Sequence, residues 1–361
     1  LRRARGAGAR VLTSNVTTAL THSTWINAWT LRRACAALDV DLRVPAGPRT
    51  LPLPTLPASA APEWQFFTEE SSLRLGLQGT LGGRFLPEHF PADLLDDKWA
   101  FAGFLQQDPN GPAGLAQWPL DAQAEARYPL LLKSRHSWVR GRKLPRGWVC
   151  RDPHELADRR AALQAQGFDE AWFFLQEWLG EAPLKLLSVG GFFDAADTSR
   201  NLAVVTERVA DYGDAGPSSS AMLVTVPDTE GLVPRAEHVL ARLGYRGPYE
   251  LEFIVIGARV LALELNPRFW MQHGLFLAAG NGLVKRYLGR ETAADRAAPA
   301  PQRLLWVDGT WLLRRLLRAD RRVLALWRMW VRERGYRAVV CPSLAQALWA
   351  GTWRALGGGL A

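Results

Sequence analysis

The sequence predicts a mixed fold in which a small parallel α/β domain precedes an α+β core and a helical region follows. Residues 10–16 and 41–44 have strand composition and flank a helical pattern at 24–38, an order typical of a parallel α/β unit. Residues 249–268 alternate apolar and polar side chains as the two strands of a hairpin do. Residues 310–331 repeat Leu, Trp and Arg at helical spacing.

The rest of the first domain has weaker patterns. Residues 45–62 are rich in proline, which predicts an extended surface loop, and residues 64–77 have a helical pattern. The loop after the first expected strand lacks G-x-G-x-x-G, so the unit is not of the dinucleotide-binding type. That loop contains His22, which at such a position is more often structural than a ligand.

The middle of the chain alternates strand and helix patterns, as an α+β core requires. An acidic pair, Asp96 and Asp97, opens a helix that we expect to reach Gln107, because carboxylates favour the positive end of a helix dipole. We expect strands at 128–133, 173–180, 185–194 and 204–208, and helices at 152–166, 230–243 and 283–288.

The hairpin stretch reads YELEFIVIGARVLALELNPR. If its loop is the three residues Gly257 to Arg259, then Glu252 lies opposite Glu264 and Glu250 lies opposite Asn266. A two-residue loop would shift the register by one and move those groups to opposite faces. The same alternation places Val260 and Ala262 on the acidic face, which argues against the alternative of a hairpin with one solvated face.

Two facing carboxylates destabilise a sheet unless a cation lies between them. Carboxylate and amide oxygens suit Mg²⁺, with Mn²⁺ as an alternative, so Glu252, Glu264 and Asn266 are candidate metal ligands. Arg268 follows at strand spacing and is a natural partner for phosphate.

These residues carry a resemblance to a known family. Glu252 next to Phe253, followed by E-x-N-P-R at 264–268, resembles the metal-binding end of the ATP-grasp superfamily, the carboxylate–amine ligases. The resemblance extends in the same order from Asp96 to about Gly289. It implies an ATP-grasp core of two α+β subdomains at 96–290, a pre-ATP-grasp α/β domain at 1–95, and a linker with a helical C-terminal region at 291–361.

Two lysines match motifs that the family uses for nucleotide phosphates. Lys98 lies in a segment that resembles D-K-x-x-F, and Lys133 ends the strand YPLLLK. The family places a mobile glycine-rich loop next, but here residues 134–147 are basic and contain tryptophan. The resemblance implies phosphate contacts from Lys143 in this loop, with a solvated basic loop as the alternative.

The segment that begins at Gln176 resembles the family's hinge, Q-E-[WYF]-[IVL]-x-G, which lies along the adenine. By this resemblance Gln176 and Leu179 flank the base, Glu177 accepts from its exocyclic amine, Trp178 stacks, and Glu181 reaches the ribose. An aromatic residue on a strand is more often part of the core, which is the alternative for Trp178.

The implied activity is ATP- and Mg²⁺-dependent ligation of a small-molecule carboxylate to a small-molecule amine through an acyl phosphate. Arg208 and Arg268 are the candidate groups at the transferring phosphoryl. Two other classes stay open: a kinase on the same fold that phosphorylates a hydroxyl, and a non-catalytic protein that binds nucleotides or a membrane surface.

The composition favours some classes of binding partner over others. The net charge of +9 favours polyanions such as nucleotides or an anionic membrane surface. No nucleic-acid-binding motif accompanies the 16 tryptophans, so we expect no nucleic acid partner. A basic, Trp-bearing C-terminal helix packed on the core is expected, with peripheral membrane contact as the alternative; the oligomeric state is open.

Cysteine usage and the N-terminal residues bear on the compartment. Three widely spaced cysteines, Cys35, Cys150 and Cys341, predict no disulfide framework and no zinc site, as in a reducing cytoplasm. The basic stretch LRRARGAGAR is followed by residues too polar for the core of a signal peptide. We therefore expect a cytoplasmic protein.

Overall fold

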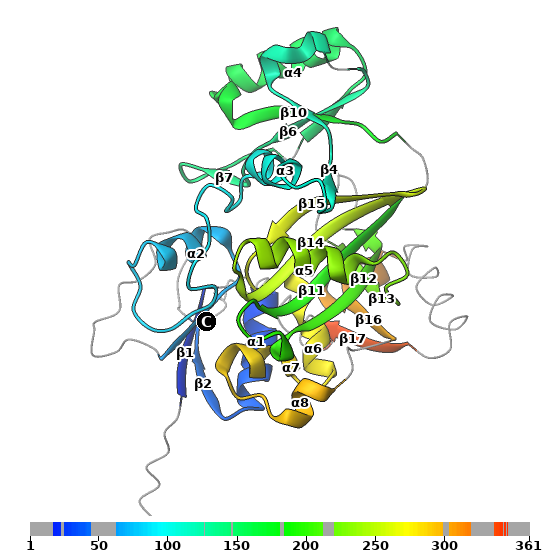
Figure 1. Cartoon of the computed structure of the whole chain (residues 1–361). Coiled ribbons are helices and arrows are strands. Elements are labelled where there is room, and N and C mark those ends of the chain that lie inside the picture. The colour runs from blue at the N-terminus through cyan, green and yellow to red at the C-terminus, as the bar shows by residue number, and fades with distance from the viewer. Residues whose placement is uncertain are drawn as a thin grey trace, which may run out of the picture.

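The computed structural model of the chain describes most of the sequence (Figure 1). The described residues are 17–22, 25–44, 63–125, 127–145, 147–180, 184–211, 220–298, 303–318, 336–341, 343 and 345. Three larger units can be followed along the chain: a parallel N-terminal sheet, a small four-stranded sheet and a large eight-stranded sheet.

The N-terminal unit is the expected parallel strand–helix–strand unit. Strand β1 (Thr17–His22) pairs in parallel with β2 (Val40–Arg43), and helix α1 (Trp25–Ala36) connects them. The expected range of the first strand, 10–16, lies outside the described residues. The proline-rich stretch at 45–62 also lies outside them.

The helix expected over residues 64–77 is wrong in its first half. Residues Trp64–Phe67 form strand β3, which pairs in parallel with β1, and only Glu70–Leu77 form helix α2. All four side chains of β3 are buried. A short apolar run that is buried on both faces has no alternation, so its sequence does not distinguish a strand from a helix.

The second unit is a small sheet with strand order β5-β10-β6-β9, seen at the top of Figure 1 with helix α4 on its outer side. Its core contains Leu130, Leu132 and Leu175 from the strands and Leu156 and Leu163 from α4. The elements are α3 (Lys98–Gln106), β5 (Gln117–Trp118), β6 (Leu130–Ser134), β7 (Trp138–Val139), β8 (Arg142–Lys143), β9 (Gly147–Cys150), α4 (Pro153–Ala165) and β10 (Phe173–Glu177).

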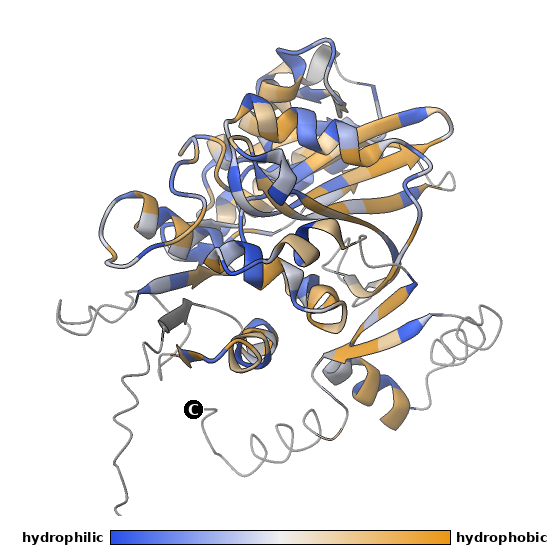
Figure 2. Cartoon of the chain, turned by 60° about the horizontal axis from the view of Figure 1, so that its bottom comes forward, coloured by the Kyte–Doolittle hydropathy of each residue, from blue (hydrophilic) through white to orange (hydrophobic). Residues whose placement is uncertain are grey.

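The third unit is the large sheet, with strand order β17-β16-β13-β12-β11-β14-β15-β4. Figure 2 shows that apolar residues dominate its strands. The elements are β4 (Ala113–Gly114), β11 (Lys185–Asp194), β12 (Leu202–Asp211), β13 (Ser220–Thr225), α5 (Leu232–Arg242), β14 (Arg246–Ile256), β15 (Arg259–Asn266), α6 (Gly274–Ala278), α7 (Gly282–Leu288), α8 (Ala293–Ala297), β16 (Leu304–Asp308), α9 (Gly309–Leu317) and β17 (Arg337–Cys341).

The two faces of the large sheet are covered differently. Helix α5 packs its apolar side, including Ala236 and Val239, on one face. On the other face, α6, α7 and the N-terminal unit cover one end, where Phe192 and Tyr287 belong to a shared core. Figure 1 shows α5 on the near side of the sheet and α1, α6 and α7 below it. The polar residues of the hairpin lie on this second face, beyond the part that the helices cover.

The hairpin formed by β14 and β15 has the expected pairing of its polar residues, but a bulge produces this pairing and not a three-residue turn. Glu252 does face Glu264 and Glu250 does face Asn266, but Ile256 pairs with Arg259, so the turn has two residues and not three. An irregularity after Glu252 restores the register, because the strand pairs Phe253 with Ala262 and leaves Leu263 as an extra residue.

This bulge also corrects the expected faces. Val260 and Ala262 pack in the core beneath α5 and do not share the acidic face. Leu261 and Ile254 lie together in a separate apolar cluster on the other side of the hairpin. Because side chains alternate with a period of two, one inserted residue exchanges the faces of every residue on one side of it.

The sequence predicts a helical C-terminal part. The structure shows that this part also contains strands. Strand β16 pairs with β13 and strand β17 pairs in parallel with β16, so both extend the large sheet. Helix α9 begins at Gly309, and residues 319–335 and 346–361 lie outside the described residues. Among the described helices, none is both long and apolar enough to cross a membrane.

Gly191 in β11 lies where the backbones of β11 and β12 approach each other closely. A Cβ atom on Gly191 of β11 would lie 1.7 Å from the carbonyl oxygen of Leu202 in the neighbouring strand, whereas a Cβ on Gly103 in α3 would meet nothing within 4 Å.

We expect Gly191→Ala to destabilise the protein by about 3 kcal/mol, because the strands would have to separate. The matched variant Gly103→Ala should gain about 0.5–1 kcal/mol from helix propensity. Urea denaturation of both variants measures the difference, and equal stability of the two would contradict this account of the β11–β12 contact.

Candidate active site

The candidate site is built on the face of the large sheet opposite α5. Glu252 from β14 and Glu264 from β15 face each other across the strand pair, and both are only partly exposed. Burial raises the pKa of Glu252 above its usual range, and repulsion from the charge of Glu264 raises it further. Cationic side chains from other elements approach both carboxylates.

Lys98 reaches Glu264 from the start of helix α3. Its Nζ lies 3.1 Å from Glu264 Oε1 and 3.6 Å from Asp96 Oδ1. Burial opposes the charged form of Lys98, but Glu264 and Asp96 outweigh burial, so the pKa of the lysine lies above its usual value. The helix begins here because Asp97 caps it by accepting from the backbone N–H of Ala100 at 3.0 Å.

Lys133 approaches the same carboxylate from the small sheet. Its Nζ donates to Gln176 Oε1 at 3.3 Å, which links β6 to β10. Burial and the nearby charge of Lys98 lower the pKa of Lys133 to about 8, although Glu264 and Glu252 act in the opposite direction. The charges of Lys98 and Lys133 together hold the pKa of Glu264 below its usual value despite burial.

Arg208 from β12 lies on the far side of the carboxylate pair. Its Nη2 is 3.7 Å from Glu252 Oε2. The structure therefore brings five of the expected site residues into one cluster: Glu252, Glu264, Lys98, Lys133 and Arg208. Three secondary-structure elements, α3, β6 and β12, supply its cations, so the cluster exists only in the folded chain.

Arg268 is held by groups that the sequence did not indicate. Its Nε and Nη2 both lie 2.5 Å from Glu70 Oε1 at the start of α2, and its Nη1 donates to the carbonyl oxygen of Phe269 at 3.0 Å. The charge of Glu70 raises the pKa of Arg268 although burial opposes it. The N-terminal unit thus contributes a carboxylate to the site.

Asn266 joins Arg268 to Glu250. Its Oδ1 accepts from Arg268 Nη2 at 3.4 Å, and its Nδ2 donates to Glu250 Oε2 at 3.1 Å. Burial and the charge of Glu252 raise the pKa of Glu250 to about 8. The amide of Asn266 is therefore engaged with Glu250 and Arg268, beside the Glu252–Glu264 pair.

The hinge residues have separate environments. Gln176 is buried and holds Lys133. Glu177 accepts from the backbone N–H of Ala116 at 3.0 Å and from Arg259 Nη2 at 3.0 Å, so its side chain ties β10 to the turn of the hairpin. A carboxylate can accept further hydrogen bonds beside these two, so the contact with an adenine amine expected for Glu177 stays a prediction.

Leu179 lies near the site through apolar packing. It packs against an apolar cluster of Leu115, Ile254 and Leu261, which continues the hairpin face next to the carboxylates. Trp178 is 37% exposed and lies in the loop that follows β10. Glu181 lies outside the described residues.

The basic loop forms a hairpin that is attached at Asp96 and at the turn after α4. Arg142 donates to the carbonyl oxygens of Gln166 and Gly167 at 2.8 and 3.0 Å, and Ser137 donates to Asp96. Lys143 pairs with Trp138 on the neighbouring strand and is exposed. Within the described part of the chain, no contact joins Lys143 to Glu252 or Glu264.

Sequence reasoning missed Glu70, Glu250 and Asp96 as site residues. Glu70 carries no signal in the sequence, because nothing local shows that α2 faces the end of β15. Glu250 was already expected on the acidic face opposite Asn266, and that placement was a usable signal. Asp96 was interpreted only as part of a helix start, since an acidic residue there is common.

The donor set fits a divalent cation that shares its ligands with phosphates. The described residues contain no cluster of three or more His, Cys, Asp or Glu side chains able to hold a metal ion. Two facing carboxylates, Glu252 and Glu264, are therefore the protein's main oxygen donors. Mg²⁺ characteristically takes one or two carboxylates and completes its shell with phosphates and water, so this sparse set is compatible with it.

No protein-family model and no curated protein matches the sequence. Solved structures do match in three dimensions, and those described below are ATP-grasp proteins of low sequence identity to this chain. The chain has the ATP-grasp fold.

Three of these structures illustrate the match. Biotin carboxylase from Campylobacter jejuni is 13% identical, with 77% of this chain and 72% of that chain covered and a TM-score of 0.55. Carboxyaminoimidazole ribonucleotide synthase from Aspergillus clavatus, complexed with ATP, is 13% identical, with 78% and 79% covered and a TM-score of 0.54. L-Amino acid ligase from Bacillus licheniformis is 12% identical, with 78% and 76% covered and a TM-score of 0.54.

The raised pKa of Glu250 has a measurable consequence for stability. Its pKa rises from 4.5 to about 8 on folding, so the folded state holds a proton that the unfolded state releases. The contribution of this group to stability is full below pH 4.5 and is lost as the pH rises to about 8.

We therefore expect the free energy of unfolding of the native protein to fall between pH 5 and 8 in buffer without metal or nucleotide. The fall should be smaller in Glu250→Gln, which keeps an oxygen for Asn266 but cannot ionise. Urea denaturation at several pH values measures this, with Asp158→Asn on exposed α4 as the control. A slope that is the same in native protein and Glu250→Gln would show that Glu250 is not the group responsible.

Proposed function

We propose that the protein is an ATP- and Mg²⁺-dependent ligase that activates a small-molecule carboxylate as an acyl phosphate and joins it to an amine. The observation that carries the proposal is the Glu252–Glu264 pair with Lys98 and Lys133 converging on it, on an ATP-grasp fold. Among the structures of similar fold are an L-amino acid ligase and an ATP complex of a carboxyaminoimidazole ribonucleotide synthase.

The residues divide into three roles. Lys98 and Lys133 bind the phosphates of ATP, while the backbone after Gln176 and the side chain of Leu179 lie along the adenine. Glu252 and Glu264, with Asn266 as a further oxygen donor, would hold Mg²⁺, or Mn²⁺ in its place. A bound cation would neutralise charge on the phosphates and polarise the γ-phosphoryl group.

The present ion pair indicates how the site accommodates nucleotide. Lys98 Nζ lies 3.1 Å from Glu264 Oε1. With nucleotide and a divalent cation bound, Glu264 would hold the cation and Lys98 would contact a phosphate oxygen. Both the buried carboxylate and the ammonium would then keep a partner of opposite charge.

The two arginines stabilise charge at the reacting centre. A substrate carboxylate oxygen attacks the γ-phosphorus, the bond from that phosphorus to the ADP oxygen breaks, and the amine then displaces phosphate from the acyl carbon. Arg208 lies beside Glu252, Arg268 lies beside Asn266, and both would bind the oxygens that carry the developing charge. Glu70 and Asn266 fix the orientation of Arg268.

A phosphate-release assay tests the proposal. The protein is incubated with Mg-ATP and panels of carboxylates and amines, and hydroxylamine is used to trap an acyl phosphate as a hydroxamate. Phosphate release that requires a carboxylate, with a hydroxamate product, supports the ligase. A phosphorylated alcohol would identify a kinase, and ATP binding without turnover on any panel would identify a non-catalytic protein.

The metal assignment makes a direct prediction. Glu264→Ala should abolish ATP turnover, by about a hundredfold or more, because it removes a carboxylate at the transferring phosphoryl. The fold should persist, since Glu264 is at the site face and not in the core. Asp158→Ala on exposed α4 is the matched control. Unchanged turnover in the Glu264 variant would refute the metal site.

The contact between Glu70 and Arg268 makes a second prediction. Glu70→Gln should lower kcat by about tenfold, because Arg268 loses the charge that orients it, and Glu70→Asp should recover part of that loss. Asp93→Asn, on the exposed connector that follows, should behave as the native protein. If Glu70→Gln lowered only thermal stability and left kcat unchanged, Glu70 would be a structural residue alone.

A further inference from the structure

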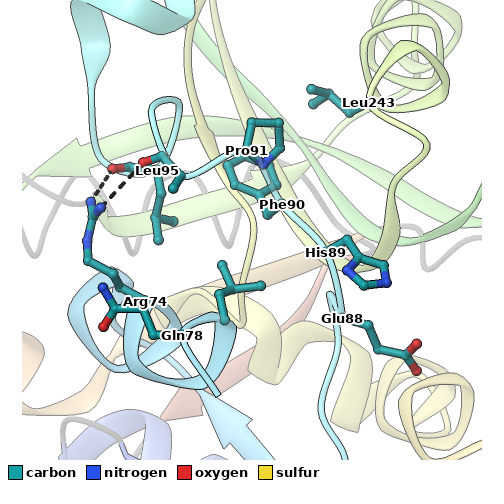
Figure 3. A pocket seen from close by; sticks show the side chains of 10 residues that line it. Arg74, Gln78, Glu88, His89, Phe90, Pro91, Leu95 and Leu243 are labelled. Carbon is teal, nitrogen blue, oxygen red and sulfur yellow. Dashed lines mark hydrogen bonds between the residues drawn. The ribbon is translucent and has the colours of Figure 1, made fainter. Parts of the chain in front are cut away.

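A cavity lies away from the carboxylate site, between helix α2, the connector at 88–95 and the end of helix α5. Its volume is about 410 Å³. Figure 3 shows Arg74 and Gln78 on one side, Phe90 and Pro91 in the middle, and Leu243 opposite. Pockets that bind small molecules begin at about 300 Å³, so a compact organic molecule fits here.

Arg74 is the polar group that distinguishes this cavity. Its guanidinium is partly buried and donates to the carbonyl oxygens of Leu95 at 2.7 Å and Ala92 at 3.3 Å. In the described part of the chain no carboxylate lies within ion-pair distance of it. An arginine has five N–H donors and two are used here, so the side chain keeps both a charge and donors for a further partner.

The remaining walls are mainly apolar. Leu77, Phe90, Leu95 and Leu243 all line the cavity, and each is at least partly buried. Glu88 is an exposed lining residue, free to extend into solvent. A guanidinium beside an apolar wall is complementary to a molecule with one anionic group and an apolar body.

We propose that this cavity is a binding site for a small apolar monocarboxylate, whose carboxylate pairs with Arg74 and whose body packs against Phe90 and Leu243. The two carbonyl contacts hold the guanidinium in place before the ligand arrives, which lowers the entropy lost on binding. The carboxylate also gives a partly buried cation the counter-charge that the protein itself does not provide.

The cavity is connected to the candidate active site through two elements. Arg74 lies one turn after Glu70 on α2, and Glu70 holds Arg268. Leu95, whose carbonyl oxygen accepts from Arg74, immediately precedes Asp96, and Asp96 contacts Lys98. A ligand that pairs with Arg74 therefore acts on the supports of both Arg268 and Lys98, and its binding should change the rate of ATP turnover.

Direct binding tests the site without reference to turnover. The probes are butyrate, hexanoate, phenylacetate and indole-3-acetate at millimolar concentration, measured by saturation-transfer NMR and calorimetry. Phenethyl alcohol is the neutral counterpart of phenylacetate. We expect at least one carboxylate to bind, and to bind about tenfold more tightly than its neutral counterpart because of the charged hydrogen bonds to Arg74.

Three variants locate the binding. Arg74→Met should weaken it by about tenfold, and Leu243→Trp should block it by filling the cavity while leaving Arg74 in place. Arg32→Met, on the exposed side of α1, should have no effect. No binding by any of the four carboxylates, equal binding of phenylacetate and phenethyl alcohol, or binding unchanged in Leu243→Trp would each overturn the proposal.

The failure of this proposal and of the proposed ligase activity can be distinguished. Binding that Leu243→Trp blocks supports the site even if no panel of substrates gives phosphate release. Where turnover is found, a bound carboxylate that changes kcat in native protein but not in Leu243→Trp shows the predicted coupling. Binding without any change in kcat would retain the site and refute the coupling.

Discussion

The site depends on the balance between two facing carboxylates and the cations that surround them. Glu252 and Glu264 are opposed across adjacent strands, an arrangement that destabilises a sheet in isolation. Lys98 comes from the helix that begins the core, Lys133 from the small sheet and Arg208 from the next strand but one. Each unit of the fold therefore supplies a charge that the others require, and the relative placement of the units is coupled to the electrostatics of the site.

The same dependence extends to the N-terminal unit. Glu70 holds Arg268, and one turn later on α2 Arg74 donates to the connector that leads to Asp96 and Lys98. A backbone hydrogen bond from Phe269 to Phe67 joins strand β3 to the residue that follows Arg268. The N-terminal unit thus completes the site and is not merely attached to it.

Local sequence patterns predicted a large part of this arrangement. The helices at α3, α4 and α5 and the strands β6, β10 and β11 follow from apolar periodicity and capping residues, which act within a few positions. Glu252, Glu264, Lys98, Lys133 and Arg208 were all expected at the site, and the structure brings them together. The parallel order of β1 and β2 was also expected from the helix between them.

By itself, then, the sequence determined which elements form and which charged residues they carry, because those properties depend on neighbours along the chain. Only the tertiary structure decided the bulge at Leu263, the pairing of β16 with β13 and the contact between Glu70 and Arg268. Each depends on contacts between elements that come together only when the chain folds. Patterns among neighbouring residues therefore do not indicate these contacts. The bulge is the clearest case: it keeps the carboxylates opposed although the turn is one residue shorter than the pattern suggested.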